Sequence, residues 1–105
     1  MIVNHLKPPY YAVIFTTFLT DDLEDYDATA QRLEQLAEKQ EGYLGIEHAR
    51  SELGITISYW RSRASILNWK NNVEHSEARK RGKEQWYKQY QLRICKVEHE
   101  YGFKK

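Results

Sequence analysis

The stretch YLGIEHARSELGITISYWR, residues 43–61, carries the pattern that decides the fold. Residues 43–50 and 55–61 carry apolar side chains at alternate positions, such as Leu44 and Ile46 in the first and Ile55 and Ile57 in the second, and the short segment between them contains Gly54. Two such runs joined by a glycine-containing loop predict a β-hairpin. The middle of the chain is therefore expected to be a pair of antiparallel strands.

Upstream of the hairpin, residues 10–19 form an apolar run that predicts a further strand. Both alternating sets of this run are apolar, so both faces of the strand should be covered. A helix is expected to begin within a few residues of Asp25, with Asp25 or Asp27 capping its first turn, and to stop before Gly42. Residues 1–9 contain a Pro-Pro pair and predict an extended arm.

Downstream, Ser62 can cap a helix over residues 63–73, and a third helical stretch is expected at about residues 75–87, weakened by a glycine near its end. Residues 89–103 alternate and predict the last strand. The order β-α-β-β-α-β, with the second helix split, predicts a ferredoxin-like split sandwich: an α+β fold with one antiparallel sheet.

Composition narrows the class of protein. The length of 105 residues, without a repeat or a linker, predicts one domain over residues 1–105. A net charge of +1, from 16 basic and 15 acidic residues, argues against nucleic acid as a partner. The longest apolar run is about half the ~20 residues of a membrane helix, so no membrane association is expected. The single cysteine, Cys95, and the polar N-terminus favour the cytoplasm.

Helices in this order cover one face of the sheet and leave the other open. The open face is expected to carry a set that is mostly apolar: Ala12, Ile14, Phe18, Ser58, Trp60, Val97 and Tyr101. Large apolar patches are rare on soluble monomers, so we expect a homodimer in which a second copy covers this face. A slip of one residue would exchange the two sets, but both faces of residues 10–19 are apolar, so the expectation stays.

Several segments resemble the antibiotic biosynthesis monooxygenase family. They are Gly42-Tyr-Leu-Gly-Ile-Glu-His-Ala-Arg50, Leu53-Gly-Ile-Thr-Ile-Ser-Tyr-Trp-Arg-Ser62, and Ala64-Ser-Ile-Leu-Asn-Trp69 with His75 beyond it. The resemblance runs from about Tyr10 to Tyr101. It implies a dimeric α+β barrel made by the sheets of two ferredoxin-like subunits, with a pocket between helices and sheet in each. Characterised members include cofactor-free oxygenases of quinol precursors, other enzymes acting on quinols, and heme-degrading enzymes.

The same resemblance makes His75 the candidate catalytic base. A histidine can take a proton from a phenol or quinol at neutral pH, and the resulting electron-rich anion can react with O₂. Alternatively, His75 caps or packs the start of the third helix. Trp69 is a candidate wall of the pocket or plain core. On one continuous helix these residues would not share a face, since six steps of ~100° separate them by about 120°. We therefore expect a helix break at Asn71-Asn72, with the Trp69 and His75 side chains both reaching the same cavity.

Four further residues are candidate substrate contacts. Asn68 and Asn72 flank Trp69 and could hydrogen-bond a ligand, although exposed helix polarity explains them equally well. Tyr59 and Phe15, together with Trp60, could line a flat cavity for an aromatic ring.

Metal and heme binding find less support in the sequence. The histidines and Cys95 lack the spacing of a metal site, so no metal is expected. Heme-degrading relatives use an axial His at a position that falls here near Arg79, and an Asn in the first strand; residues 10–19 contain none. The basic cluster of residues 79–83 is interpreted as a solvated helix face rather than an anion site.

The leading hypothesis is therefore a cofactor-independent monooxygenase that oxidises a quinol-like or phenolic small molecule with O₂, without a bound cofactor. A non-catalytic ligand-binding or sensing dimer of the same fold is the alternative. A heme-binding or heme-degrading protein is a second alternative, disfavoured by the departures above.

Overall fold

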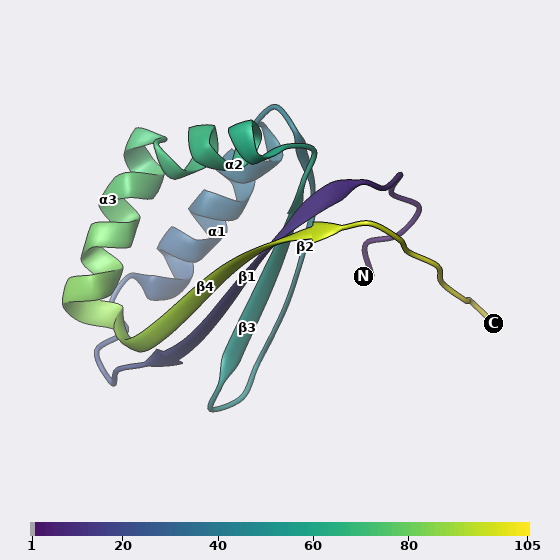
Figure 1. The fold of residues 1–105 in the computed structure, drawn as a ribbon. Coiled ribbons are helices and arrows are strands. Elements are labelled where there is room, and N and C mark those ends of the chain that lie inside the picture. Colours follow the sequence, from purple (N-terminus) through teal and green to yellow (C-terminus); the bar gives the residue numbers. More distant parts are fainter. Residues whose placement is uncertain (1) are drawn as a thin grey trace.

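The computed structural model describes residues 2–105, which form one four-stranded sheet with helices on one face (Figure 1). In chain order the elements are β1 (Tyr10–Leu19), α1 (Tyr26–Glu38), β2 (Tyr43–Arg50), β3 (Gly54–Trp60), α2 (Arg63–Lys70), α3 (Val73–Arg81), a π-helical turn η1 (Gly82–Trp86) and β4 (Tyr87–Val97). The strand order is β2-β3-β1-β4, and every neighbouring pair is antiparallel. The predicted ferredoxin-like α+β fold is confirmed.

The last helix and strand differ most from the expectation. The third helical stretch ends as α-helix at Arg81 and continues as the π-helical turn η1, which delivers the chain into β4 at Tyr87. A Cβ at Gly82 would overlap the ring of Tyr87, so only glycine fits this turn. At its other end β4 stops at Val97, because Val97 pairs with Tyr10, the first residue of β1, and β1 offers no partner beyond it.

The helix caps confirm one expectation and correct another. Ser62 caps α2, since its Oγ accepts a hydrogen bond from the N–H of Ser65 at 3.1 Å. Asp25 stands at the N-cap position of α1 with φ of 63°, but its side chain makes no capping hydrogen bond. Its carboxylate instead pairs with Arg81 at 3.0 Å, because the tertiary ion pair draws it away from the helix end.

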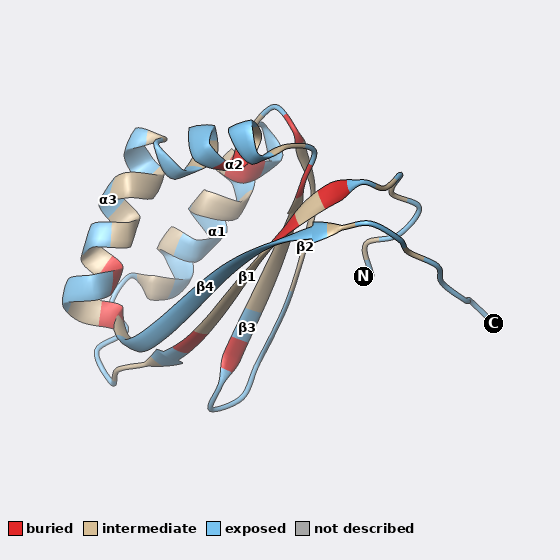
Figure 2. Ribbon diagram, viewed as in Figure 1, coloured by how far each residue is buried: buried red, intermediate tan, exposed pale blue. Residues whose placement is uncertain are grey.

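The core lies between the sheet and the helices and is centred on Trp60, which is 0% exposed. Ala37 and Ile66 are buried beside it, whereas β4 is exposed along most of its length (Figure 2). Trp60 packs with Ala37 of α1 and Ile66 of α2, so the expectation that it faces the open side of the sheet is wrong. The register explains this: Trp60 pairs with Tyr11, whose side chain belongs to the helix-facing set of β1.

The open face is therefore a partly different set from the expected one. Ser58 also turns to the helices, because it pairs with Val13. Tyr101 lies beyond β4 and is exposed. The open face carries from β1, β3 and β4 mainly Tyr10, Ala12, Ile14, Phe18, Ile55, Ile57, Tyr59, Cys95 and Val97, and from β2 Glu47 and Ala49.

Both terminal segments lie against one end of the open face. The backbone N–H of Val3 donates to Glu47 at 2.9 Å, and the hydroxyl of Tyr10 donates to Glu100 at 2.6 Å. These contacts bury Tyr10, and burial with the Glu100 carboxylate nearby raises the pKa of Tyr10 to about 12. Residues 2–9 contain no helix or strand, as expected of an arm, and the two termini leave the sheet at the same end (Figure 1).

Candidate functional site

A break between α2 and α3 brings Trp69 and His75 together, as the sequence predicts. α2 ends at Lys70 and α3 begins at Val73. The side-chain oxygen of Asn72 accepts a hydrogen bond from the backbone N–H of His75 at 3.1 Å and so starts the new helix. The change of axis turns the two side chains toward each other.

Trp60, Trp69 and His75 form an aromatic column that rises from the sheet. The Trp69 ring stacks on Trp60 with centroids 6.3 Å apart, and the His75 ring stacks on Trp69 at 4.3 Å with only 11° between the planes. Trp60 belongs to β3, Trp69 to α2 and His75 to α3. The imidazole is thus held flat by elements from both layers of the fold.

A hydrogen bond fixes the tautomer of His75. Its Nδ1 lies 2.8 Å from the backbone carbonyl oxygen of Trp69, which can only accept, so Nδ1 carries the proton. Nε2 therefore carries the lone pair. Within residues 2–105 it has no hydrogen-bond partner, and since no buried side-chain nitrogen or oxygen of these residues lacks a partner, Nε2 is accessible to solvent. Burial lowers the pKa of His75, and Arg79 lowers it further against the opposing Trp69 carbonyl. The ring is therefore a neutral base at pH 7.

The other candidate contacts do not gather around this column. Asn68 is exposed on α2, and the Asn72 oxygen is engaged in capping. Tyr59 lies on the open face, where its hydroxyl donates to Glu47 at 2.6 Å, so the expected cavity shared by Tyr59, Trp60 and Phe15 does not form. Neighbouring residues of a strand point to opposite faces, which separates Tyr59 from Trp60.

Phe15 faces the helices but belongs to a second aromatic cluster. Its ring packs against Tyr87 and Tyr90, with centroids 5.4 and 5.3 Å away. Phe15 follows Tyr11 on β1 by four residues, which places it about 13 Å along the strand from the Trp60 end. The cluster is therefore distinct from the Trp69–His75 column.

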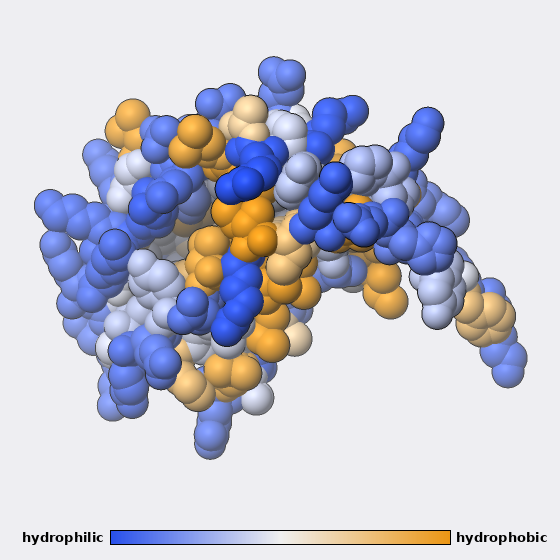
Figure 3. Space-filling model, viewed as in Figure 1, coloured by the Kyte–Doolittle hydropathy of each residue, from blue (hydrophilic) through white to orange (hydrophobic). Residues whose placement is uncertain are grey.

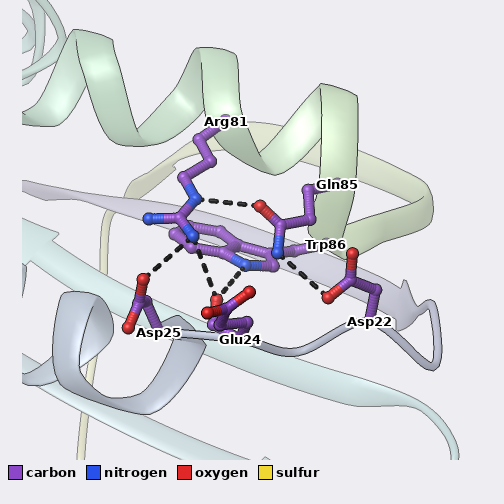
Figure 4. Close-up of polar contacts among 6 residues, drawn as sticks. All are labelled: Asp22, Glu24, Asp25, Arg81, Gln85 and Trp86. Carbon is purple, nitrogen blue, oxygen red and sulfur yellow. Dashed lines mark hydrogen bonds and ion pairs between the residues drawn. The ribbon is translucent and has the colours of Figure 1, made fainter.

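Two contacts anchor α3 at its ends and so hold His75 in place. Near the start, Glu74 pairs with Arg32 of α1 at 3.2 Å. Near the end, Arg81 lies over the Trp86 ring at 5.0 Å, pairs with Asp25 and donates to Gln85, and the Trp86 indole donates to the Glu24 carbonyl (Figure 4). The interpretation of residues 79–83 as a solvated helix face is therefore wrong for Arg81, because Arg81 contacts Trp86 of η1 and Asp25 in the loop before α1.

Cavities lie at the two edges of the sheet, and they differ in charge. A shallow cleft of about 340 Å³ at the β4 edge is lined by Tyr11, Arg63, Ile94, Cys95 and Lys96. A cavity of about 490 Å³ at the β2 edge is lined by Ile2, Glu34, Ile46, Glu47 and His48. His75 and Trp69 line neither of these cavities, so the expectation that both side chains reach one cavity is not met at either edge. Tyr11, however, both lines the first cleft and packs against the Trp60 core to which Trp69 belongs.

Two kinds of feature are absent from residues 2–105. These residues include no cluster of three or more His, Cys, Asp or Glu side chains able to hold a metal ion. None of the described helices has the length and apolar character needed to cross a membrane.

Comparisons with known proteins place the chain in a family. A model of the family described as Antibiotic biosynthesis monooxygenase matches residues 9–81. The chain belongs to this family. The uncharacterised protein YqjZ of Bacillus subtilis (strain 168) is 42% identical over 94 residues, which cover 88% of this chain and 82% of YqjZ. The family match includes Trp69 and His75 and stops before β4.

Solved structures of low sequence identity share the fold. Rv0793 from Mycobacterium tuberculosis superposes with a TM-score of 0.77 at 13% identity, covering 89% of this chain and 99% of Rv0793. SnoaB, a cofactor-independent oxygenase from Streptomyces nogalater, gives a TM-score of 0.74 at 6% identity, covering 89% of this chain and 97% of SnoaB. At these sequence identities the structural similarity shows that this chain shares the fold, but it does not identify the reaction of this chain.

Sequence reasoning misses the cationic cleft at the β4 edge. Arg63 and Lys96 are far apart in the chain and meet only through the packing of α2 on the sheet. One signal is present: Lys96 shares the alternating set of Leu92 and Ile94, so a cation on the helix-facing side of β4 is foreseeable from the sequence.

Proposed function

We propose that this family member is a cofactor-independent monooxygenase that oxidises a quinol-like or phenolic small molecule with O₂, and that His75 is its catalytic base. In this proposal Nε2 removes a hydroxyl proton, and the resulting anion passes one electron to O₂. The substrate radical and superoxide then combine at a ring carbon that bears hydrogen and form a peroxide. Loss of water from this peroxide breaks the O–O and C–H bonds and leaves one oxygen atom on the substrate as a carbonyl, so the substrate itself supplies the electrons that reduce the second oxygen atom to water. Trp69 holds the imidazole by stacking and through its backbone carbonyl. Residues 1–105 would act as one domain in the cytoplasm, where the exposed thiol of Cys95 would stay reduced.

The observation that carries this proposal is the state of the imidazole. A base must be unprotonated at working pH, and burial lowers the pKa of His75 in that direction. It must also present its lone pair outward, and the bond from Nδ1–H to the Trp69 carbonyl leaves Nε2 to do so. A histidine that only held the helix break would also bond the Trp69 carbonyl through Nδ1, so the accessible Nε2 is the feature that favours a base.

The test is oxygen consumption with a panel of quinols and anthrones. Wild type, His75→Gln and His99→Gln are compared; His99 is exposed, stacks loosely on Tyr101 and serves as the matched control. We expect a loss of kcat of about 10²–10⁴-fold in His75→Gln, the usual contribution of a general base, and no loss in His99→Gln. Equal turnover in both variants would remove His75 from the chemistry.

A non-catalytic ligand-binding protein is the second candidate, and one observation favours it. His75 lines neither of the two cavities at the edges of the sheet. If no quinol or anthrone is consumed faster than in buffer while small aromatic molecules still bind, the binding function replaces the oxygenase.

We also propose that the protein works as a homodimer whose copies pack through the open face of the sheet. Phe18 and Ile55 are partly exposed there, and the directly paired Ile14 and Ile57 continue the apolar patch along β1 and β3. Light scattering at micromolar concentration should give twice 12.6 kDa. Ile57→Asp should yield monomers, whereas Leu67→Asp, on the exposed side of α2, should leave the mass unchanged. A wild-type monomer with an intact fold would refute the dimer.

A further inference from the structure

The cleft at the β4 edge has a floor of apolar side chains that the helices leave uncovered. On the helix-facing set of β4, Leu92 is 46% and Ile94 is 43% exposed. Tyr11 of the neighbouring strand β1 continues this floor beside Ile94 and Lys96. Figure 3 shows apolar surface between the helices and β4, bordered by strongly hydrophilic residues. Such a floor suits the face of a flat, apolar ring.

Two cations border the same cleft. Arg63 is the first residue of α2, and Lys96 lies near the end of β4. In the part of the chain that the structure describes, neither side chain forms an ion pair, since the ion pairs found there are Arg32–Glu74 and Arg81–Asp25. Two like charges facing one cavity repel each other, and a negatively charged ligand would relieve that repulsion.

The cavity at the opposite edge shows that this charge pattern is local. Glu34 and Glu47 line that cavity, so it would repel the anion that the β4 edge attracts. With a net charge of +1, the chain has no general excess of positive charge to explain anion binding elsewhere.

We infer that the cleft formed by Tyr11, Arg63, Ile94 and Lys96 binds a small aromatic molecule that carries an anionic group, with the ring on Tyr11 and Ile94 and the anion between Arg63 and Lys96. The cleft's volume of about 340 Å³ holds one or two fused rings with a carboxylate or sulfonate. That this ligand is also the substrate rests on the proposed function; the binding itself does not.

The binding test uses two probes that differ in charge. 1-Anilinonaphthalene-8-sulfonate is anionic and N-phenyl-1-naphthylamine is its neutral counterpart, and both are followed by their fluorescence. Arg63→Gln with Lys96→Gln should weaken sulfonate binding about tenfold, as expected from two exposed ion pairs, and leave the neutral probe unchanged. Loss of a cation from the first turn of α2 does not weaken that helix, since its N-terminus favours negative charge.

Controls separate this cleft from general effects of charge and from the open face. Lys39→Gln with Lys70→Gln removes the same charge from exposed positions outside both cavities and should not change sulfonate binding. Added NaCl should weaken sulfonate binding to wild type and not to the Arg63→Gln, Lys96→Gln variant. Equal sulfonate affinity in wild type and that variant would overturn the inference, because the dye would then bind elsewhere.

A second measurement keeps this inference apart from the oxygenase. With 2,5-dihydroxybenzenesulfonate and hydroquinone as paired quinols, the Arg63→Gln, Lys96→Gln variant should raise KM for the sulfonate and leave KM for hydroquinone and both kcat values unchanged. Sulfonate-dye binding without oxygen consumption would refute the proposed function and keep the site. Oxygen consumption with an unchanged KM for both quinols would support the proposed function and refute the anion-binding cleft as its substrate site.

Discussion

Replacing Trp60 with alanine should remove the centre of the core. Trp60 is fully buried, its ring packs edge-on against Tyr43 at 5.5 Å, and it supports Trp69 from below. Its indole N–H also donates to the Ser58 hydroxyl at 2.9 Å. Deletion of a buried aromatic side chain costs about 3–5 kcal/mol. Because the contacts of Trp60 come from the helices as well as the sheet, we expect a value in the upper part of that range.

Urea unfolding followed by circular dichroism measures this loss. With a denaturant slope of about 1.5 kcal/mol/M, a loss of 3–5 kcal/mol lowers the midpoint by roughly 2–3 M. Trp60→Phe keeps a ring but loses the bond to Ser58, and should cost about 1–2 kcal/mol. Leu67→Ala, at a side chain 55% exposed, should cost less than about 1 kcal/mol. All variants are compared at one protein concentration, since the proposed dimer would make stability concentration-dependent.

The outcome distinguishes the two faces of the sheet. A loss below about 1 kcal/mol in Trp60→Ala would mean that the ring is exposed and that the observed register is wrong. Monomerisation by Trp60→Phe without a loss of stability would place the residue on the open face. The structure predicts neither, because Trp60 packs with Ala37 and Ile66 under the helices.

Three further perturbations test the surroundings of the site. The pKa of His75 is lower in the folded protein than in the unfolded chain, so the unfolded chain takes up a proton first as the pH falls. The free energy of unfolding should therefore decrease as the pH drops below about 6.5. In His75→Gln the urea midpoint should depend less on pH between pH 5 and 8 than it does in wild type. Gly42 has φ of +86°, and a Cβ at this position would overlap the Ser65 side chain. Gly42→Ala should therefore lower the free energy of unfolding by about 1–3 kcal/mol from backbone strain, and by more because of the overlap. Adding Ser65→Gly to this variant should recover part of the loss in the same urea assay. Arg81→Gln removes the cation over Trp86 and should cost about 1–2 kcal/mol, with faster hydrogen exchange in η1; unchanged exchange would show that the contact does not anchor the turn.

The parts of the fold that the sequence predicts are those set by local pattern. β1 and β2 have the bounds that the sequence pattern predicts, and Ser62 caps α2 because capping depends on residues within one turn. The face of Trp60 is different. Alternation divides β3 into two sets, but it does not say which set meets the helices; that depends on the register with β1, which pairs Trp60 with Tyr11.

The candidate site shows the same division. The break before His75 is predictable, because helical geometry cannot bring residues 69 and 75 to one face and Asn72 is a good helix start. The stacking of the two rings and the hydrogen bond from Nδ1 are tertiary results of that break. The presence of Arg63 and Lys96 in one cleft cannot be predicted from local sequence pattern, because it depends on the β1–β4 register and on where α2 packs on the sheet.

Tyr11 belongs both to the lining of the cationic cleft and to the core that supports the aromatic column. The cleft and His75 can therefore serve one reaction, the cleft by binding the ligand and His75 by proton transfer. Tyr11 lines the cleft and packs against the core beneath Trp69, so a ring lying on Tyr11 would be next to the column without touching Arg63. If the two features serve one reaction, removing the cations should act on KM and removing His75 should act on kcat. Combined in one protein, the effects on kcat/KM should then multiply, because the anion contact and the proton transfer involve different atoms. A combined variant no worse than His75→Gln alone would mean that the cleft serves a separate ligand.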